Sequence, residues 1–413
     1  MKTRTLFRTM AASWLVLAVM LIFFEVSRSR QARAADKDQQ AAVGDFKLSG
    51  PFSHENLTIF LIHGEDRIDG KKILTLQEGL EQKKVVIHET GNVNELAIEN
   101  VSKDEEIFIQ SGDILKGGRQ DRLISFSMIL AAQSGKVPVA VFCVEHGRWQ
   151  QRGKEAAGWF TSSTSQLPSK ALKVNGGAYA QLGGNMGFGG GNQGFGGGTN
   201  LGAGGGNQGF GSGNQGFGGG TNLGAGGGNQ GFGGGNQGGV WTEVTAFQNK
   251  LMANAGVEVR AKESPTSLQL TLENKKVKET VDRYTEKLAS ILNGRTDVIG
   301  YAFAINGKVN SAEVYGSAAL FKNLWPKLLR ANATEALAEL QKGKQFDPVT
   351  ADAVKTCLLD ANTDKTQRDY VAIQKTLAKR TIVLMRETEQ SIFLETRDRE
   401  QEGGWIHRTY VTK

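Results

Sequence analysis

The sequence predicts an α+β fold, in which an antiparallel, strand-rich N-terminal half is followed by helices and a β-hairpin in the C-terminal half. Between residues 46 and 144, short runs rich in Val, Ile and Phe follow a period of two and are mostly separated by Gly, Asn, Asp or Ser, which is typical of antiparallel strands. After Gly239 the apolar period becomes that of α-helices. Asn306-Gly307 then divides two further apolar runs, and this dipeptide favours the positive φ angles of a two-residue hairpin turn.

Six apolar runs predict strands in the N-terminal half, and one helix interrupts them. We expect the helix over residues 76–82, because Thr75 and Glu78 have the spacing of a capping box. The strands are predicted over Leu57–Ile62, Lys84–Glu89, Glu95–Glu99, Glu106–Gln110, Arg122–Leu130 and Val137–Val144.

Two amphipathic helices are predicted directly after Gly239, because apolar residues there recur every three or four positions. The first carries its apolar face from Val240 to Leu251, and the second carries Val277, Tyr284 and other apolar residues as far as Ile291. The predicted hairpin follows over residues 298–315.

The rest of the C-terminal half predicts two more helices and three strands. Residues 317–341 have a helical pattern that breaks or restarts at Pro326. Asp347-Pro348 is typical of an N-cap and first helical residue, and predicts a helix that ends near Leu359. A closing β-meander is predicted over Thr381–Met385, Ser391–Thr396 and Trp405–Val411.

Residues 1–35 have the layout of an export signal, with Lys2, Arg4 and Arg8 before an apolar run over residues 11–24. The small-residue pattern at 32–34 predicts cleavage between Ala34 and Ala35. The basic stretch before that position leaves an uncleaved anchor open, and only then would the protein contact a membrane. In either case we expect an exported protein that lies in the periplasm, in the cell envelope or outside the cell.

The charge distribution argues against a nucleic-acid-binding protein. Of the formal net charge of +7, residues 1–35 supply +5, so the rest of the chain is nearly neutral. A protein that holds nucleic acid presents a basic surface on its folded body. We therefore expect no nucleic acid among the partners.

Two cysteines far apart in an exported chain leave two interpretations open. Cys143 lies in an apolar run and Cys357 in a helical pattern. Either both are buried as small apolar residues, or they form a single disulfide bridge.

Glycine is concentrated in an insert over residues 176–239, which contains 33 of the 54 glycines and no charged residue. The fifteen residues NQGFGGGTNLGAGGG occur from Asn192 and again from Asn214. Because ordering so many glycines costs much conformational entropy, we expect a disordered surface loop. A glycine-rich solenoid and an adhesive segment remain alternatives, and an adhesive segment would bind protein partners through Phe188, Phe195, Phe210, Phe217 and Phe232.

One loop, Ser111–Arg122, is denser in functional residue types than the rest of the chain, and Glu145–Trp149 follows the next long strand. If the two segments lie on neighbouring strands, their arginines, amide and indole would suit a small anionic or nucleotide-like ligand. Glu145 and His146 are the candidate catalytic residues. The ligand-binding candidates are Asp113, Gly117, Gly118, Arg119, Gln120, Arg122, Arg148 and Trp149.

A purely structural interpretation of the same residues also stands. The two glycines fit a tight turn, Glu145 and Arg148 fit an ion pair, and Trp149 fits a core cap. No metal site is expected, because the five histidines are scattered without the spacing of metal ligands. No cofactor is assigned.

Several segments together resemble the ARG and rhodanese-phosphatase-superfamily-associated protein domain (ARPP-type). They are Leu74–Leu80, the Ser111–Arg122 loop, Val139–Trp149, Val298–Ser317 and Leu320–Ala336. The likeness runs from about Leu48 to Leu340, so the glycine-rich insert would interrupt one domain over residues 46–340. Residues 341–413 would pack on that domain. The family's name implies an ADP-ribose or NAD-derived ligand.

Two functions follow as expectations. The first is an exported domain that binds or processes an ADP-ribose-like or nucleotide-like ligand at the Ser111–Arg122 loop, with any catalysis left open. The second is a non-enzymatic, envelope-associated scaffold that contacts partners through its Gly- and Phe-rich loop.

Overall fold

The computed structural model describes residues 41–43, 46–68, 70–148, 159–176, 237–360, 370–372, 380–400 and 404–413. The predicted export segment, Trp149 and nearly all of the glycine-rich insert lie outside these ranges. Within them the chain has an α+β fold with largely antiparallel sheets, which confirms the predicted fold class. No helix among the described residues has the length and apolar character needed to cross a membrane.

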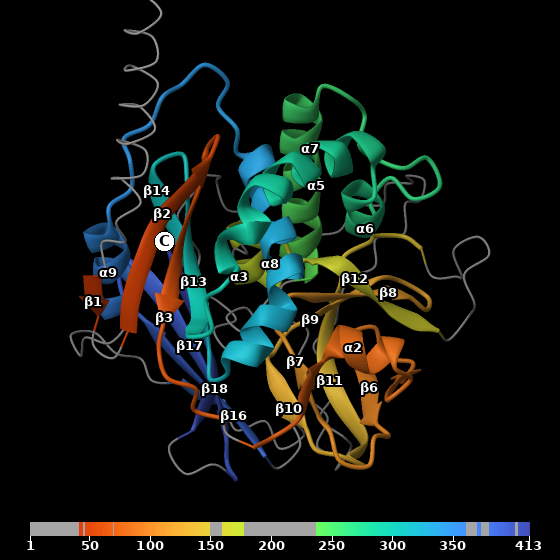
Figure 1. Cartoon of the computed structure of the whole chain (residues 1–413). Coiled ribbons are helices and arrows are strands. Elements are labelled where there is room, and N and C mark those ends of the chain that lie inside the picture. Colours follow the sequence, from red (N-terminus) through yellow and green to blue (C-terminus); the bar gives the residue numbers. More distant parts are fainter. Residues whose placement is uncertain are drawn as a thin grey trace, which may run out of the picture.

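The largest sheet has nine strands in the order β1-β2-β3-β13-β14-β18-β17-β16-β15, and all of its neighbours are antiparallel (Figure 1). It joins strands from both ends of the chain, since β13 pairs with β3 and β14 pairs with β18. The strands are β1 Ala41–Val43, β2 Phe46–His54, β3 Leu57–His63, β13 Val298–Ile305, β14 Lys308–Tyr315, β15 Tyr370–Ala372, β16 Thr381–Glu387, β17 Ser391–Asp398 and β18 Trp405–Thr412.

Two smaller sheets come from the N-terminal half of the chain. A six-stranded sheet has the order β12-β8-β9-β11-β6-β5, and a three-stranded sheet has the order β10-β7-β4 with β4 and β7 parallel. Their strands are β4 Ile73–Thr75, β5 Val85–Glu89, β6 Glu95–Asn100, β7 Glu106–Ile109, β8 Asp113–Gly117, β9 Arg122–Ile124, β10 Met128–Leu130, β11 Gly135–Cys143 and β12 Phe160–Gln166.

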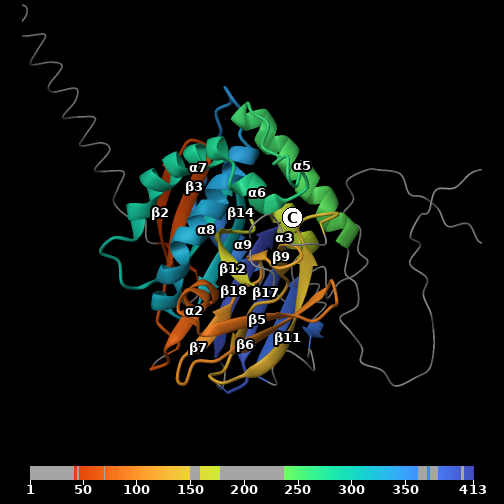
Figure 2. The ribbon, with the colours of Figure 1, turned by 90° about the vertical axis from the view of Figure 1, so that its right-hand side faces the viewer.

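The helices α5, α6, α7 and α8 gather at one end of the sheets, above the six-stranded sheet in both ribbon views (Figures 1 and 2). By contrast, α2 packs against β5 and β7, and α9 packs against β1, β2 and β14. The longest, α8, packs against β13 of the large sheet, β12 of the six-stranded sheet and the helices α5 and α7. The helices are α2 Leu76–Glu81, α3 Lys170–Gly176, α5 Gln237–Ala255, α6 Leu268–Leu272, α7 Lys275–Leu288, the 3₁₀ helix η1 Ala289–Leu292, α8 Ala318–Ala338 and α9 Ala351–Asp360.

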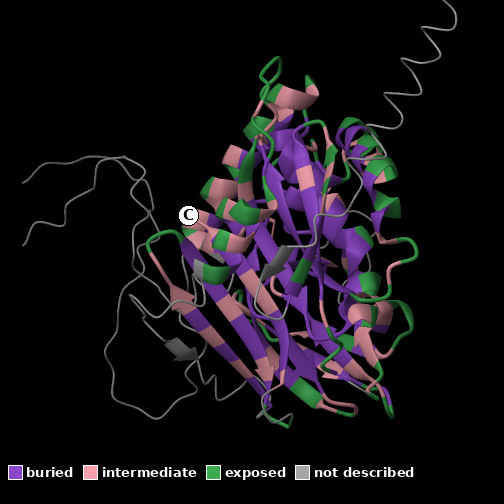
Figure 3. Cartoon of the chain, turned by 60° about the vertical axis from the view of Figure 1, so that its left-hand side comes forward, coloured by how far each residue is buried: buried purple, intermediate pink, exposed green. Residues whose placement is uncertain are grey.

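Apolar residues of all these layers share a buried interior, while exposed residues lie on outer helix faces and loops (Figure 3). Aromatic rings join β13, β14 and α8, because Tyr301 packs against Phe321 and Trp325, and Phe321 also packs against Tyr315. Each such ring buries a large apolar area, so these side chains help to hold α8 on the large sheet.

Two short-range predictions are confirmed by backbone geometry. Asn306 and Gly307 have φ angles of 53° and 74°, as a type I′ turn between β13 and β14 requires. At α2, the Thr75 hydroxyl accepts the Glu78 N–H at 3.2 Å, and the Glu78 carboxylate accepts the Thr75 N–H at 2.8 Å.

Other expected boundaries were wrong. The α8 helix is continuous through Pro326, where the sequence predicted a break or a restart. The α9 helix begins at Ala351, because Thr350 rather than Asp347 accepts a first-turn N–H, that of Ala353 at 3.2 Å. The predicted strand 122–130 is two strands, β9 and β10, which belong to different sheets.

Both cysteines are buried and neither is in a disulfide, so the predicted alternative of a Cys143–Cys357 bridge is not formed. Burial raises the pKa of the Cys143 thiol above its ordinary value.

Candidate functional site

The glycine pair of the predicted loop sits where β8 turns toward β9 and touches the start of β12. Gly117 and Gly118 have φ angles of 122° and 56°. A Cβ atom on Gly117 would lie 2.3 Å from the carbonyl oxygen of Trp159, and one on Gly118 would lie 2.3 Å from the ring of Phe160. Only glycine fits both the backbone conformation and the close approach of β12.

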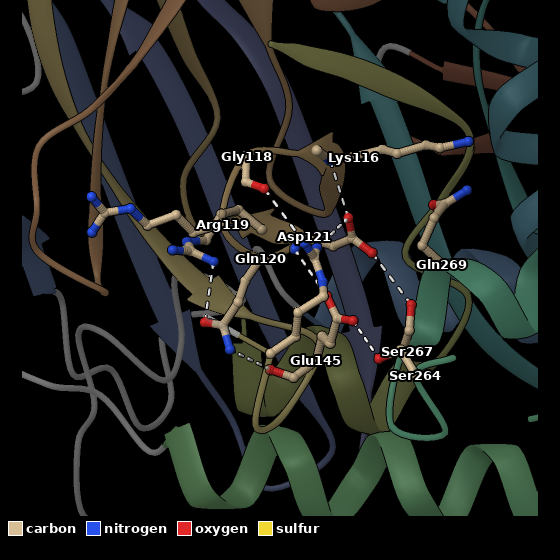
Figure 4. A network of polar contacts seen from close by, with 12 residues as sticks. Lys116, Gly118, Arg119, Gln120, Asp121, Glu145, Ser264, Ser267 and Gln269 are labelled. Carbon is tan, nitrogen blue, oxygen red and sulfur yellow. Dashed lines mark hydrogen bonds and ion pairs between the residues drawn. The ribbon is translucent and has the colours of Figure 1, made fainter. Parts of the chain in front are cut away.

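Behind this turn, acidic and basic side chains form a buried polar network (Figure 4). Arg148 donates from Nε to Glu145 Oε2 at 2.8 Å, and its Nη2 lies 3.5 Å from Asp121 Oδ1. Asp121 Oδ1 also accepts the Gly117 N–H at 3.1 Å. Asp121 and Glu145 are fully buried, so these partners must offset the cost of removing the two carboxylates from water.

Two serines before and at the start of α6 complete the network from the opposite side. The Ser264 hydroxyl donates to Glu145 Oε1, and the Ser267 hydroxyl donates to Asp121 Oδ2 at 3.3 Å. Ser267 is also the N-cap of α6, where its side chain accepts the Leu270 N–H. The network therefore joins the β8–β9 turn to α6 as well as to the end of β11.

Gln120 and Arg122 extend the network toward β5. Gln120 donates to the Glu145 carbonyl oxygen at 3.3 Å and accepts from Arg122 Nη1 at 3.3 Å. Arg122 is fully buried, and its Nη2 lies 3.9 Å from Glu89 Oε2. Glu89 in turn accepts the Arg119 N–H at 3.0 Å. The conformation of the turn is thus fixed by β5, by the start of β12, by the residues after β11 and by the residues before α6.

A cavity of about 420 Å³ lies beside the turn, at Lys116. Its wall includes three basic side chains, Lys116, Lys278 and Arg330, and one acidic side chain, Glu273. The remaining lining residues are Ser163, Thr164, Ser165, Gln269, Leu272, Val281 and Thr334. The volume is in the range of small-molecule sites, and the excess of basic groups favours an anion.

The chain was compared with family models, curated proteins and solved structures. The model of ARPP-1, the ARG and Rhodanese-Phosphatase-superfamily-associated Protein domain, matches residues 45–181 and 222–411. The chain belongs to the ARPP-1 family. No curated protein and no solved structure matched. The matched region extends past Leu340, where the sequence resemblance ended, and takes in α9 and β16–β18.

Most of the predicted site residues lie together in the ARPP-1 domain, but they form hydrogen bonds and ion pairs with one another. Gln120, Arg122, Glu145 and the side chain of Arg148 are buried within the network. Arg119 is exposed and extends away from Asp121 and Glu145, whereas Lys116 extends to the other side (Figure 4). Lys116 belongs to β8, whereas Arg119 follows Gly118 in the turn itself, so the two cations leave the turn in different directions.

Three predicted residues lie outside this network. Asp113 is at the opposite end of β8, where it accepts from Lys327 Nζ of α8 at 2.6 Å. His146 is exposed, and its ring packs edge-on against Trp241 at 4.4 Å between centroids. Trp149 falls outside the described residues. His146 and Glu145 therefore face different surroundings although they are adjacent in sequence.

Sequence patterns did not identify several residues that lie around the β8–β9 turn of this ARPP-1 domain. Lys278 and Arg330 reach the cavity from α7 and α8, more than 150 residues after Lys116. Trp159 is 70% exposed, and its carbonyl oxygen accepts the Gly118 N–H at 3.3 Å. Trp159 is far from the glycine pair along the sequence, so no local pattern linked the two. Within the described ranges, no group of three or more His, Cys, Asp or Glu side chains is placed to hold a metal ion.

Proposed function

We propose that this ARPP-1 domain binds a small anionic ligand of nucleotide or ADP-ribose type beside the β8–β9 turn. The observation that carries the proposal is the cavity at Lys116, with three basic side chains against one acidic side chain. Phosphate groups of such a ligand would lie among Lys116, Lys278 and Arg330. The neighbouring hydroxyls of Ser163–Ser165 supply further donors.

The existing ion pairs of these cations leave them available to a phosphate. Lys116 lies 2.5 Å from Glu273 and Arg330 lies 2.8 Å from Asp282, but all four side chains are between 27% and 42% exposed. Ion pairs open to water are weak, so a doubly charged phosphate competes well for the same donors. The buried network then has a positioning role, because it holds the strand end that carries Lys116.

The exposed indole of Trp159 supports the nucleotide part of the proposal. Trp159 directly precedes β12, the strand that pairs with β8, and its carbonyl oxygen accepts the Gly118 N–H. Aromatic faces bind nucleobases by stacking, with little dependence on the base. We propose that the site works outside the cytoplasm, because residues 1–35 have the sequence of an export segment.

Isothermal titration of the full-length chain with ADP-ribose, AMP and inorganic phosphate tests the proposal. Lys278→Gln should weaken binding about tenfold, as expected for the loss of one charge-assisted hydrogen bond. Lys276→Gln removes the same charge from an exposed position of α7 outside the cavity and should bind like the unmodified chain. Equal affinities of the two variants, or no binding of any of the three ligands, would contradict the proposal.

The position of the insert supports a second candidate function, a scaffold that contacts partners through its Gly- and Phe-rich segment. The helices on either side of the insert, α3 and α5, pack against each other. The folded body is therefore continuous without the insert. We propose that replacing residues 177–236 with a short Gly-Ser linker leaves thermal unfolding unchanged and abolishes envelope association. Unaltered association in the deletion variant would remove this candidate.

A further inference from the structure

Ser127, His407 and Glu313 form a hydrogen-bonded chain at a second cavity, away from the β8–β9 turn. Ser127 Oγ lies 3.1 Å from His407 Nδ1, and His407 Nε2 lies 2.8 Å from Glu313 Oε2. All three residues are at most 5% exposed. A hydroxyl, an imidazole and a carboxylate in this order are the groups of an activated nucleophile, its base and the group that orients the base.

The surroundings of Glu313 fix the proton positions in this chain. Burial alone would raise the Glu313 pKa, but the charge of Lys173 and the hydrogen bonds from His407 and Thr409 outweigh it and lower that pKa. Lys173 Nζ lies 3.4 Å from Oε1, and Thr409 donates to Oε2 at 2.7 Å. An ionised Glu313 can only accept, so His407 donates to it from Nε2 and presents Nδ1 to the Ser127 hydroxyl.

The imidazole and the hydroxyl are both held in place. The His407 ring stacks on Tyr315 at 4.7 Å and meets Phe108 edge-on at 5.7 Å. Ser127 Oγ accepts the Ser111 N–H at 2.9 Å, which leaves the hydroxyl proton to point at His407. A fixed ring and a fixed oxygen are what general-base activation requires. In common triads Nε2 faces the serine, whereas here the ring is turned so that Nδ1 does.

The three hydrogen-bonded residues line a small cavity of about 40 Å³ between the large sheet and the β9–β10 loop. Its apolar wall consists of Val174, Val383, Ile392, Leu394 and Val411, and its polar wall consists of Ser111, Ser127, Lys173, Glu313, Thr396, His407 and Thr409. The volume exceeds the roughly 10–15 Å³ that one water molecule needs. A pocket of this size with one apolar wall and a serine in its polar wall suits a short acyl group.

We propose that Ser127 is the nucleophile of an acyl-transfer site that takes small acyl esters. Ser127 Oγ forms a bond to the acyl carbon, and His407 Nδ1 takes the hydroxyl proton. The ester C–O bond breaks, and the leaving alkoxide receives that proton from Nδ1. Water then attacks the acyl carbon with proton transfer to Nδ1. The bond between Ser127 Oγ and the acyl carbon breaks, Oγ takes the proton back from Nδ1, and the carboxylic acid leaves.

This site is independent of the proposed anion site, because it shares no lining residue with the cavity at Lys116. Failure of one proposal therefore leaves the other untouched. No local pattern indicated this site, because Ser127 fell inside one predicted strand and His407 lies 280 residues away.

The experiment uses p-nitrophenyl acetate on the full-length chain, with release of p-nitrophenol and peptide mass spectrometry as measurements. We expect release in the unmodified chain and an acetyl group on Ser127. Ser127→Ala should abolish both. Ser125 is a buried serine two residues away that takes no part in the Ser127–His407–Glu313 hydrogen bonds and does not line the cavity. Ser125→Ala should therefore retain both.

His407→Gln should slow acetylation about 10²-fold or more, as expected for loss of a general base. Glu313→Gln should slow it less, because the imidazole is then oriented by a weaker acceptor. Thermal unfolding of each variant separates loss of reactivity from loss of fold. The proposal is overturned if the folded, unmodified chain carries no acetyl group on Ser127, or if Ser127→Ala releases p-nitrophenol at the unmodified rate.

Discussion

Gln237 holds both backbone groups of Cys143 with its side-chain amide. Its Oε1 accepts the Cys143 N–H at 2.9 Å, and its Nε2 donates to the Cys143 carbonyl oxygen at 2.8 Å. Gln237 is the first residue of α5, and Cys143 is the last residue of β11. The amide thus acts as a one-residue strand partner, two residues before Glu145 of the buried network.

Gln237→Ala should lower the free energy of unfolding by about 1–3 kcal/mol, because it leaves two partly buried backbone groups without their partner. Chemical denaturation measures the loss. Thr245→Ala changes an exposed residue of the same helix and should cost less than about 0.5 kcal/mol. A similar cost for the two variants would show that the amide does not anchor α5.

Gly118→Ala should destabilise the domain by more than backbone strain alone. The new methyl group would meet both the Phe160 ring at 2.3 Å and Glu89 Oε1 at 2.7 Å. Gly147→Ala is the matched control, since Gly147 has a φ of 85° and open space around its Cα. We expect a cost of about 1–2 kcal/mol for Gly147→Ala and a larger cost for Gly118→Ala. Equal shifts in urea midpoint would contradict the close packing of β12.

Arg148→Ala should cost about 3–5 kcal/mol, because it removes the cation that faces two fully buried carboxylates. Lys275→Ala provides a control, since Lys275 forms an exposed ion pair with Glu279 and should contribute less than about 1 kcal/mol. Urea denaturation at neutral pH distinguishes the two. A small effect at Arg148 would mean that the hydroxyls of Ser264 and Ser267 and the neighbouring backbone N–H groups are enough to stabilise the carboxylates.

Local signals in the sequence predicted the parts of the fold that depend on neighbouring residues. The Asn306-Gly307 turn and the Thr75–Glu78 capping box were correct, because both depend on contacts within four residues. The pairing of β8 with β12 was not predicted, since it joins segments more than 40 residues apart and its signal is a glycine pair that also fits an ordinary turn.

The candidate sites show the same limit. The polar residues of Gln120–Arg122 and Glu145–Arg148 were singled out by their density, and they do meet in space. Their density could not show whether they face solvent or one another. The cavity at Lys116 draws its cations from three elements. The hydrogen-bonded chain takes Ser127 from the β9–β10 loop and Glu313 and His407 from two strands of the large sheet, so neither site leaves a pattern along the sequence.

Acid should destabilise the domain through Glu313. Its folded-state pKa lies below the ordinary value of 4.5, because the charge of Lys173 and the hydrogen bonds from His407 and Thr409 outweigh the effect of burial. A carboxyl group with a lowered folded-state pKa stabilises the fold fully at pH values above its unfolded-state pKa. That stabilisation is lost as the pH falls through the folded-state pKa. Glu313→Gln should therefore flatten the fall of unfolding free energy below about pH 4.5. An unchanged pH profile in this variant would contradict the assigned ionisation.

Arg119 and Lys116 give opposite predictions for ligand binding, because they leave the β8–β9 turn on different sides. Lys116 lines the cavity, whereas Arg119 is exposed and extends away from the buried network. If the cavity holds the anionic group, Lys116→Gln should weaken ADP-ribose binding about tenfold and Arg119→Gln should leave it nearly unchanged. Weaker binding by Arg119→Gln together with unchanged binding by Lys116→Gln would place the ligand on the Arg119 side of the turn, as the sequence predicted. Calorimetric titration of both variants at the same ionic strength decides between the two sides, since each removes one positive charge and the long-range electrostatic effect is matched.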